Sequence, residues 1–163
     1  MLDSRYLSDS MPFPISVSGV VTVRVVTVEA ALDQLERALA LQKACALQRQ
    51  GNEVHFRGGA FRWVSNWNVL VPISKGVLHV QPRDDGVSIF YRVTFSEMLI
   101  AVTVMMAVFV GPVVAFSSRV PVPGRIGVIL IGWSWLFGGN FALAWWRLPR
   151  FLRRSLQPQR ASD

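Results

Sequence analysis

The sequence holds very few of the side chains that bind metals or act as nucleophiles. Its 163 residues include one cysteine, Cys45, and two histidines, His55 and His79. A single cysteine excludes an intrachain disulfide and a cluster of thiolates around a metal ion. The two histidines fall on different predicted strands at no metal-binding spacing, so we expect them to be exposed. We expect no metal site, and we expect Cys45 to be a small buried residue of a helix.

Motifs of the common enzyme classes are also missing. The chain has neither of the glycine-rich patterns that hold phosphates, GxxxxGK[ST] and GxGxxG, and it lacks the GxSxG pattern around a nucleophilic serine. The adjacent carboxylates Asp84 and Asp85 lie between Arg83 and Gly86, a composition typical of a solvated turn. The sequence therefore predicts no catalytic residue, no cofactor and no enzymatic activity.

Charge is scarce as well. Charged residues make up 17% of the chain and apolar residues 52%, and the mean hydropathy is +0.37. Two runs in the last third hold no charged residue, residues 98–116 and residues 126–146. About 20 apolar residues, at a helical rise of about 1.5 Å each, cross a hydrocarbon core of roughly 30 Å. The two runs therefore predict two transmembrane helices.

The connection between the two runs is short. The continuation of a helix through it is disfavoured by Pro121, Pro123 and Gly124. The connection is also too short to form a folded domain. The two spans should therefore form an antiparallel hairpin over residues 96–146. Within the first span, the pair Gly111-Pro112 predicts a kink, because proline removes a helical hydrogen bond.

Arginines at the ends of the spans predict the orientation of the hairpin. The connection holds Arg119 and Arg125, whereas more arginines flank the hairpin on its other side. These are Arg83, Arg92, Arg147, Arg150, Arg153, Arg154 and Arg160. Basic residues concentrate on the cytoplasmic side, so both termini should be cytoplasmic, and we expect the inner membrane of a bacterium. The same positions account for most of the excess basic charge, so we expect no nucleic-acid partner.

Residues 15–28 are apolar enough to suggest a signal peptide. However, Arg24 interrupts this run, and Asp3 and Asp9 precede it where a signal peptide carries positive charge. Its valines and threonines favour a β-strand over residues 15–27, with a bulge or bend at Gly19. Residues 1–14 show little periodicity and are expected to form a flexible arm.

A helix is predicted over residues 29–50. Its leucines share one face at helical spacing, namely Leu32, Leu35 and Leu39. Thr27 suits the N-cap position and Gly51 suits the C-terminal stop. Packing on a sheet is favoured over a coiled coil, because three leucines give too few heptads.

After Gly51 the apolar period changes to two residues, which predicts short antiparallel strands. The strands are expected over residues 53–57, 60–64, 69–73, 77–81 and 87–95, with turns at residues 58–59, 74–76 and 83–86. Trp63 is expected in the core and Trp67 at the surface. The predicted fold is an α+β membrane protein, with a domain of one helix on an antiparallel sheet over residues 15–95, followed by the two-helix transmembrane hairpin.

The junction between the domain and the hairpin has no flexible linker. Only Ser96 and Glu97 separate the last predicted strand from the first span. Ser96 suits an N-cap, and Glu97 suits the first turn of a helix. The domain should therefore lie against the membrane and move together with the span.

Small residues recur at every fourth position in both spans, which allows close approach of helix backbones. The predicted helix-packing residues are Thr103, Ala107, Gly111 and Ala115 in the first span and Ser134, Gly138, Asn140 and Ala142 in the second. Asn140 belongs to this set because a polar group in lipid needs a partner, here on a neighbouring helix. Packing within one hairpin and packing between chains are equally compatible with the pattern.

Residues 147–163 are predicted to form a basic juxtamembrane tail. Arg147, Arg150, Arg153 and Arg154 alternate with apolar side chains, so we expect them to contact anionic lipids and to fix the topology.

These features predict an integral membrane protein in which the hairpin anchors a non-enzymatic interaction or assembly module. Its expected partners are membrane lipids and a second copy of the chain or another membrane protein. The alternative hypothesis is a subunit of an oligomeric channel or transporter, in which Asn140, Thr103 or Ser134 faces water. Because the spans hold no charged residue for an ion or proton relay, the first hypothesis is favoured. An enzyme or lipid-binding domain that uses the sheet face ranks third.

Overall fold

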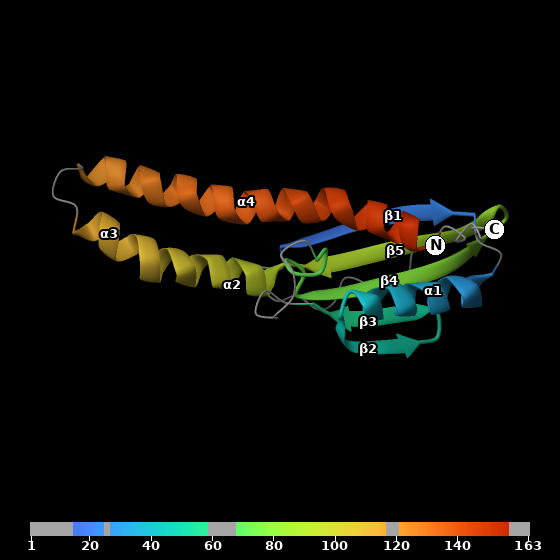
Figure 1. The fold of residues 1–163 in the computed structure, drawn as a ribbon. Coiled ribbons are helices and arrows are strands. Elements are labelled where there is room, and N and C mark those ends of the chain that lie inside the picture. The colour runs from blue at the N-terminus through green and yellow to red at the C-terminus, as the bar shows by residue number, and fades with distance from the viewer. Residues whose placement is uncertain (1–14, 25–26, 59–67, 117–120, 157–163) are drawn as a thin grey trace, which may run out of the picture.

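The computed structural model describes residues 15–24, 27–58, 68–116 and 121–156 as a small domain with a long helical hairpin. In chain order the elements are β1 (Ser16–Val23), α1 (Val28–Leu41), β2 (Cys45–Gln50), β3 (Glu53–Arg57), β4 (Lys75–Arg83), β5 (Gly86–Thr94), α2 (Ser96–Met105), the π-helical segment η2 (Met106–Val110), α3 (Gly111–Ala115) and α4 (Val122–Ser155). The hairpin projects from one end of the domain and runs roughly along the direction of the strands (Figure 1).

The strands form one antiparallel sheet in the order β1-β5-β4-β3-β2. The first strand therefore pairs with the last, from Ser16 opposite Thr94 to Val23 opposite Val87. The predicted strand over residues 53–57 is confirmed as β3, and the predicted turn over residues 83–86 joins β4 to β5. A sheet of antiparallel strands with helices confirms the α+β part of the predicted fold class.

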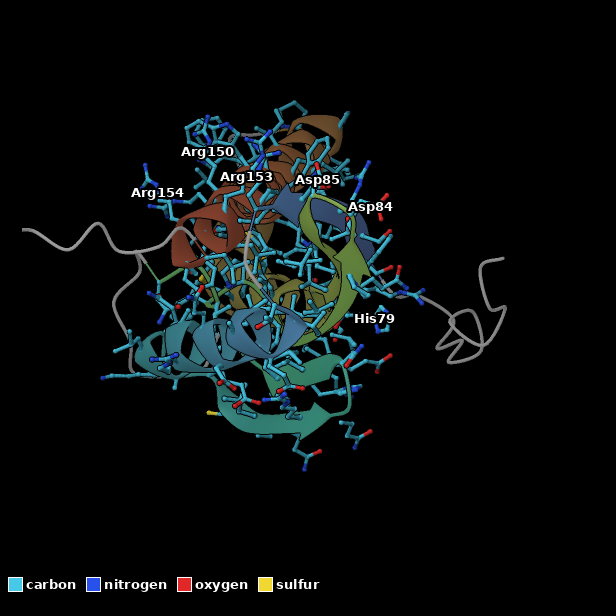
Figure 2. All side chains as sticks on the ribbon, turned by 90° about the vertical axis from the view of Figure 1, so that its right-hand side faces the viewer. His79, Asp84, Asp85, Arg150, Arg153 and Arg154 are labelled. Carbon is cyan, nitrogen blue, oxygen red and sulfur yellow. The ribbon has the colours of Figure 1, made fainter. Side chains whose placement is uncertain are left out.

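Two helices, and not the single predicted one, cover one face of this sheet. Helix α1 buries Ala31, Leu32, Leu35 and Leu39 against the sheet. The last turns of α4 lie beside α1 on the same face (Figures 1 and 2). Leu148, Leu152 and Leu156 of this segment are buried in the same core. The segment predicted as a separate basic tail is thus, as far as residue 156, a packed part of the domain.

The predicted helix over residues 29–50 is correct only in its first part. Thr27 caps α1 as expected, since its hydroxyl oxygen accepts a hydrogen bond from the backbone N–H of Ala30. The helix ends at Leu41, and Lys43 and Ala46 adopt positive φ angles of 56° and 47°. The chain then reverses into β2, so Cys45 is an exposed strand residue rather than a buried helical one.

Contacts with other segments favour this early stop. The side-chain amide of Asn68 donates to the carbonyl oxygen of Gln42 at 2.8 Å, which satisfies a group at the end of α1. Arg49 of β2 binds the carboxylates of Glu29 and Asp33 on α1. The hydrogen bond that Arg49 donates to the Glu29 carboxylate raises the pKa of Arg49. The high helix propensity of the alanines is therefore outweighed by the pairing of β2 with β3 and by these side-chain contacts. Gly51 serves the β2–β3 turn instead of a helix end.

The segment predicted as a strand over residues 69–73 forms turns instead. The Asn68 side chain accepts a hydrogen bond from the Leu70 backbone at 2.9 Å, and the N–H of Ile73 donates to the carbonyl of Leu70. Leu70 and Ile73 are buried, so their apolar character reflects the core and not a strand. Strand β4 already begins at Lys75, which replaces the turn predicted over residues 74–76. The predicted strand over residues 60–64, which includes Trp63, lies outside the described residues. The same holds for Gly59 of the predicted turn and for Trp67.

Gly19 forms neither a bulge nor a bend, because β1 pairs with β5 in unbroken register. A Cβ atom at this position would lie 2.4 Å from the hydroxyl oxygen of Tyr91, the residue paired with it. The absence of a side chain makes room for the buried Tyr91 ring. Burial also raises the pKa of Tyr91 above its ordinary value of about 10.

Candidate functional site

The junction between β5 and the hairpin is a single residue, Phe95, and this residue is buried. Strand β5 ends at Thr94 and α2 begins at Ser96, as the sequence predicts to within one residue. Phe95, not Ser96, is the N-cap residue, and its own side chain makes no capping bond. The buried hydroxyl of Ser74 accepts a hydrogen bond from the Glu97 N–H at 2.8 Å and supplies the cap from another segment.

Aromatic side chains join the junction to α4. The rings of Phe95 and Phe141 meet edge to face, with their centroids 5.0 Å apart. Phe141 also stacks near Phe137, which in turn stacks on Trp133 at 5.1 Å. The first residue of the junction thus packs into α4, and α4 continues without a break from the hairpin into the domain core.

Both long helical segments are long and apolar enough to cross a bilayer. The two stretches are Ser96–Val114 and Val122–Ser155. They pair in an antiparallel register: the Trp133 indole N–H donates to the Thr103 hydroxyl at 3.1 Å, and a Cβ atom on Gly132 would lie 3.0 Å from Met106. Gly132 therefore leaves room for the end of the Met106 side chain, and it lies outside the repeating pattern of small residues.

The predicted helix-packing residues lie mostly on the outer surface of the hairpin. Thr103, Ala107, Ser134, Asn140 and Ala142 are exposed, and Gly111 and Gly138 are partly so. The side chain of Ala115 is outside the described set. A Cβ atom on Gly138 would meet no other atom within 4 Å. Packing of these residues between chains stays a prediction.

Asn140 bonds its own helix in the part of the chain that the structure describes, and a bond from it to a helix of another chain stays a prediction. Its side-chain amide donates to the carbonyl of Leu136, one turn earlier in the same helix, at 2.7 Å. This local bond satisfies part of the amide without a second helix.

Prolines shape both ends of the connection between the helices. One turn of π-helix, η2, precedes Gly111-Pro112, and the Gly111 N–H donates to the carbonyl of Met106. The helix is therefore widened just before this pair, and the kink itself stays a prediction. The prediction that Pro123 and Gly124 stop a helix is wrong, because α4 begins at Val122. Proline fits the first turn of a helix, where its missing N–H has no partner to lose.

The predicted lipid-contacting arginines occupy the last turns of α4. Arg150, Arg153 and Arg154 are exposed and extend away from the sheet, whereas Arg147 is half-buried (Figure 2). The Arg150 guanidinium lies 3.7 Å from the centroid of the Trp146 ring, a cation–π contact. Leu148 and Leu152, on the opposite side of the helix, are buried. One amphipathic segment thus packs on the domain and presents basic groups outward.

The histidines and paired carboxylates form no active-site constellation in the described part of the chain. His55 and His79 are half-buried, and both contact the carboxylate of Glu53, at 3.1 and 3.3 Å. His79 lies on the sheet face that α1 and α4 leave uncovered (Figure 2). No group of three metal-ligating side chains suits a metal ion among the described residues. Asp84 and Asp85 are exposed, and Asp85 pairs with Arg83 at 3.4 Å.

The chain was compared with protein families, curated proteins and solved structures. No known family, curated protein or solved structure matches it. The chemistry of the hairpin and its junction is therefore the basis for a functional assignment.

Proposed function

We propose that this chain is an integral membrane protein whose hairpin anchors a non-enzymatic interaction or assembly module. The observation that carries this proposal is the outward display of large apolar side chains along both helices. The most exposed examples are Phe109, Val113, Ile131 and Trp135. In water such a surface would far exceed the apolar patches of soluble monomers, whereas lipid tails would solvate it.

The direct joint between hairpin and domain supports a role in assembly. Helix α4 belongs both to the hairpin and to the domain core, and Phe95 fixes the start of α2 against it. A change in helix packing within the membrane would therefore reorient the whole domain. This direct connection suits a module whose domain changes orientation, or becomes more stable, when the hairpin assembles with a partner in the membrane.

The outward-facing small residues favour a second copy or another membrane protein as the partner. Ser134, Gly138 and Ala142 recur at helical spacing on an exposed side of α4. Small residues at this spacing allow close contact between helices in lipid. We propose that this side of α4 forms a contact between chains, with the domains held in the cytoplasm.

Crosslinking in native membranes tests the proposal. The natural cysteine is first removed by Cys45→Ser, and Gly138→Cys is then compared with Gly139→Cys. These two positions lie at the same depth but about 100° apart around the helix. We expect resistance to carbonate extraction for both proteins and disulfide-linked dimers for Gly138→Cys at least fivefold above Gly139→Cys.

Equal crosslinking at both positions would reject the proposed face of α4, and extraction by carbonate would reject membrane insertion. Rapid reaction of cysteines placed at Thr103 and Asn140 with a membrane-impermeant thiol reagent would favour the channel hypothesis instead. In the described structure the Thr103 hydroxyl donates to the Leu99 carbonyl at 2.8 Å and accepts from Trp133. Both bonds stay within the hairpin.

A further inference from the structure

The end of the sheet from which α2 leaves gathers basic side chains from separate segments. Arg57 of β3 pairs with Lys75 of β4, and Lys75 pairs with Thr94 at the end of β5. Arg92 lies two residues before Thr94, and Lys43 lies just before β2, whose first residue pairs with Arg57. We call these four residues, Lys43, Arg57, Lys75 and Arg92, the basal rim.

Acidic residues lie mainly toward the other end of the domain. Asp84 and Asp85 occupy the far β4–β5 turn, and Glu29 lies in the first turn of α1, after the far end of β1. Within the described residues, Glu97 is the acidic residue at the basal end, where it pairs with Arg57 at 3.4 Å. The far end also carries Arg83 and Arg49, which pair with Asp85 and Glu29, so its charges largely balance. The excess positive charge of the described domain therefore lies at the end toward the hairpin.

Helix α4 extends this positive end. Phe141 lies opposite Phe95, so it marks the level at which α2 begins. Trp146 follows five residues later, about 8 Å farther along the helix axis. Trp145 and Trp146 are 60% and 58% exposed, and the charge of Arg150 stacks on Trp146. Exposed tryptophans followed by arginine are typical of the boundary between lipid tails and headgroups.

We propose that the basal rim, together with Arg147, binds the headgroups of anionic phospholipids in the leaflet where α2 begins. This inference rests on the proposed membrane insertion. The headgroup layer is about 5–8 Å thick on each side of the hydrocarbon core, which matches the height of Trp146 above Phe141. Apart from Glu97, which pairs with Arg57, the described charges of this surface are positive. They complement lipid phosphates, and basic residues near such a surface attract anionic lipids.

The four predicted lipid-contacting arginines lie at different heights along α4. Arg153 and Arg154 lie about 18–20 Å beyond Phe141 along α4, which is well outside a headgroup layer. They are therefore assigned to the solvent side of the domain. In their place the structure assigns lipid contact to Arg57, Lys75 and Arg92, of which Arg57 and Lys75 are remote from the spans in sequence.

Cys45 provides a natural probe because it is exposed, it is the single cysteine of the sequence, and it lies beside Arg57 at the rim. The full chain would be labelled there with a fluorophore and reconstituted in mixed phosphatidylcholine and phosphatidylglycerol vesicles. Quenching is measured with a headgroup-spin-labelled form of either lipid. We expect phosphatidylglycerol to quench about fivefold more than phosphatidylcholine, which corresponds to the contribution of about one basic residue near the surface.

Two variants with equal loss of charge make the test specific. The rim variant carries Arg57→Gln, Lys75→Gln and Arg92→Gln, and the matched control carries Arg24→Gln, Arg83→Gln and Arg154→Gln. We expect the preference for phosphatidylglycerol to fall toward one in the rim variant and to persist in the control. A third variant, Arg57→Lys with Arg92→Lys, keeps the charge and should keep the preference even where the neutral rim variant folds poorly.

Equal quenching by the two lipids in the natural chain would overturn the proposal, and so would an equal loss of preference in the rim and control variants. Extraction of the labelled natural chain by carbonate, with no quenching by either lipid, would instead indicate that membrane insertion itself fails. Resistance to extraction without a lipid preference would retain the membrane anchor and reject the basal rim as a lipid site.

Discussion

Gly19 and Tyr91 face each other across the first and last strands of the sheet, and the space between them is already full. Replacement of Gly19 by alanine would place a methyl group 2.4 Å from the Tyr91 hydroxyl oxygen and 2.5 Å from the ring carbon that carries it. The ring must then leave its buried position or the strands must separate. Overpacking of this kind destabilises proteins by about 1–3 kcal/mol.

We therefore predict that Gly19→Ala lowers the thermal unfolding midpoint of the detergent-solubilised full chain. The neighbouring substitution Ser18→Ala, at an exposed position of the same strand, serves as the control and should change little. An unchanged midpoint in Gly19→Ala would show that Tyr91 can move without cost.

At the scale of the elements, the cap at the start of α2 differs from the one that the sequence suggests. The hydroxyl of Ser74 accepts the Glu97 N–H, whereas Ser96 is exposed and outside the capping position. We predict that Ser74→Ala destabilises the full chain by about 1 kcal/mol, the typical cost of a lost cap, and that Ser96→Ala has a much smaller effect. Hydrogen exchange at the Glu97 amide would report the loss directly. A larger effect from Ser96→Ala would contradict this assignment.

The elements that the sequence predicts well are those in which local pattern and tertiary contact agree. Strands β3 and β5 alternate cleanly, and their alternate residues, among them Val54, Phe56, Ile89 and Val93, are buried as the alternation requires. The stretch from Lys43 to Gln50 differs from its prediction because its alanines favour a helix, whereas the structure pairs it with the neighbouring strand β3. Arg49 also binds the carboxylates of Glu29 and Asp33, which lie far earlier in the sequence. The apolar periodicity of a segment does not indicate which other segments it will contact.

At the scale of the whole molecule, the end of α4 is the part that sequence reasoning placed least well. Pro149 and the arginines suggest a polar tail, yet Leu148, Leu152 and Leu156 recur on one side and are buried. Their spacing was a usable signal for a packed helix. The basal rim was not accessible from sequence, because strand register alone brings Arg57 and Lys75 together.

We predict that Leu152→Ala destabilises the domain by about 2–5 kcal/mol, because Leu152 is fully buried between α4 and the rest of the core. Arg153→Ala, at the next and exposed position, is the matched control and should have little effect. Limited proteolysis of the full chain would detect the loosened domain as faster cleavage within residues 15–95. Equal cleavage rates for the two variants would show that the end of α4 contributes little to the core.

The continuity of α4 also sets the order in which the molecule can be made. The sheet is complete once the ribosome has produced Thr94, but part of its cover, from Leu148 to Leu156, is synthesised only after both hydrophobic helices. An emerging chain therefore carries an uncovered apolar sheet face until the hairpin has been delivered to its destination. Under the proposed membrane insertion, the last turns of α4 return to the side of the membrane that holds the domain, so the domain would close only after the second helix has crossed. Domain closure would then act as a check on insertion, and a chain whose second helix fails to insert would expose that sheet face to chaperones and proteases.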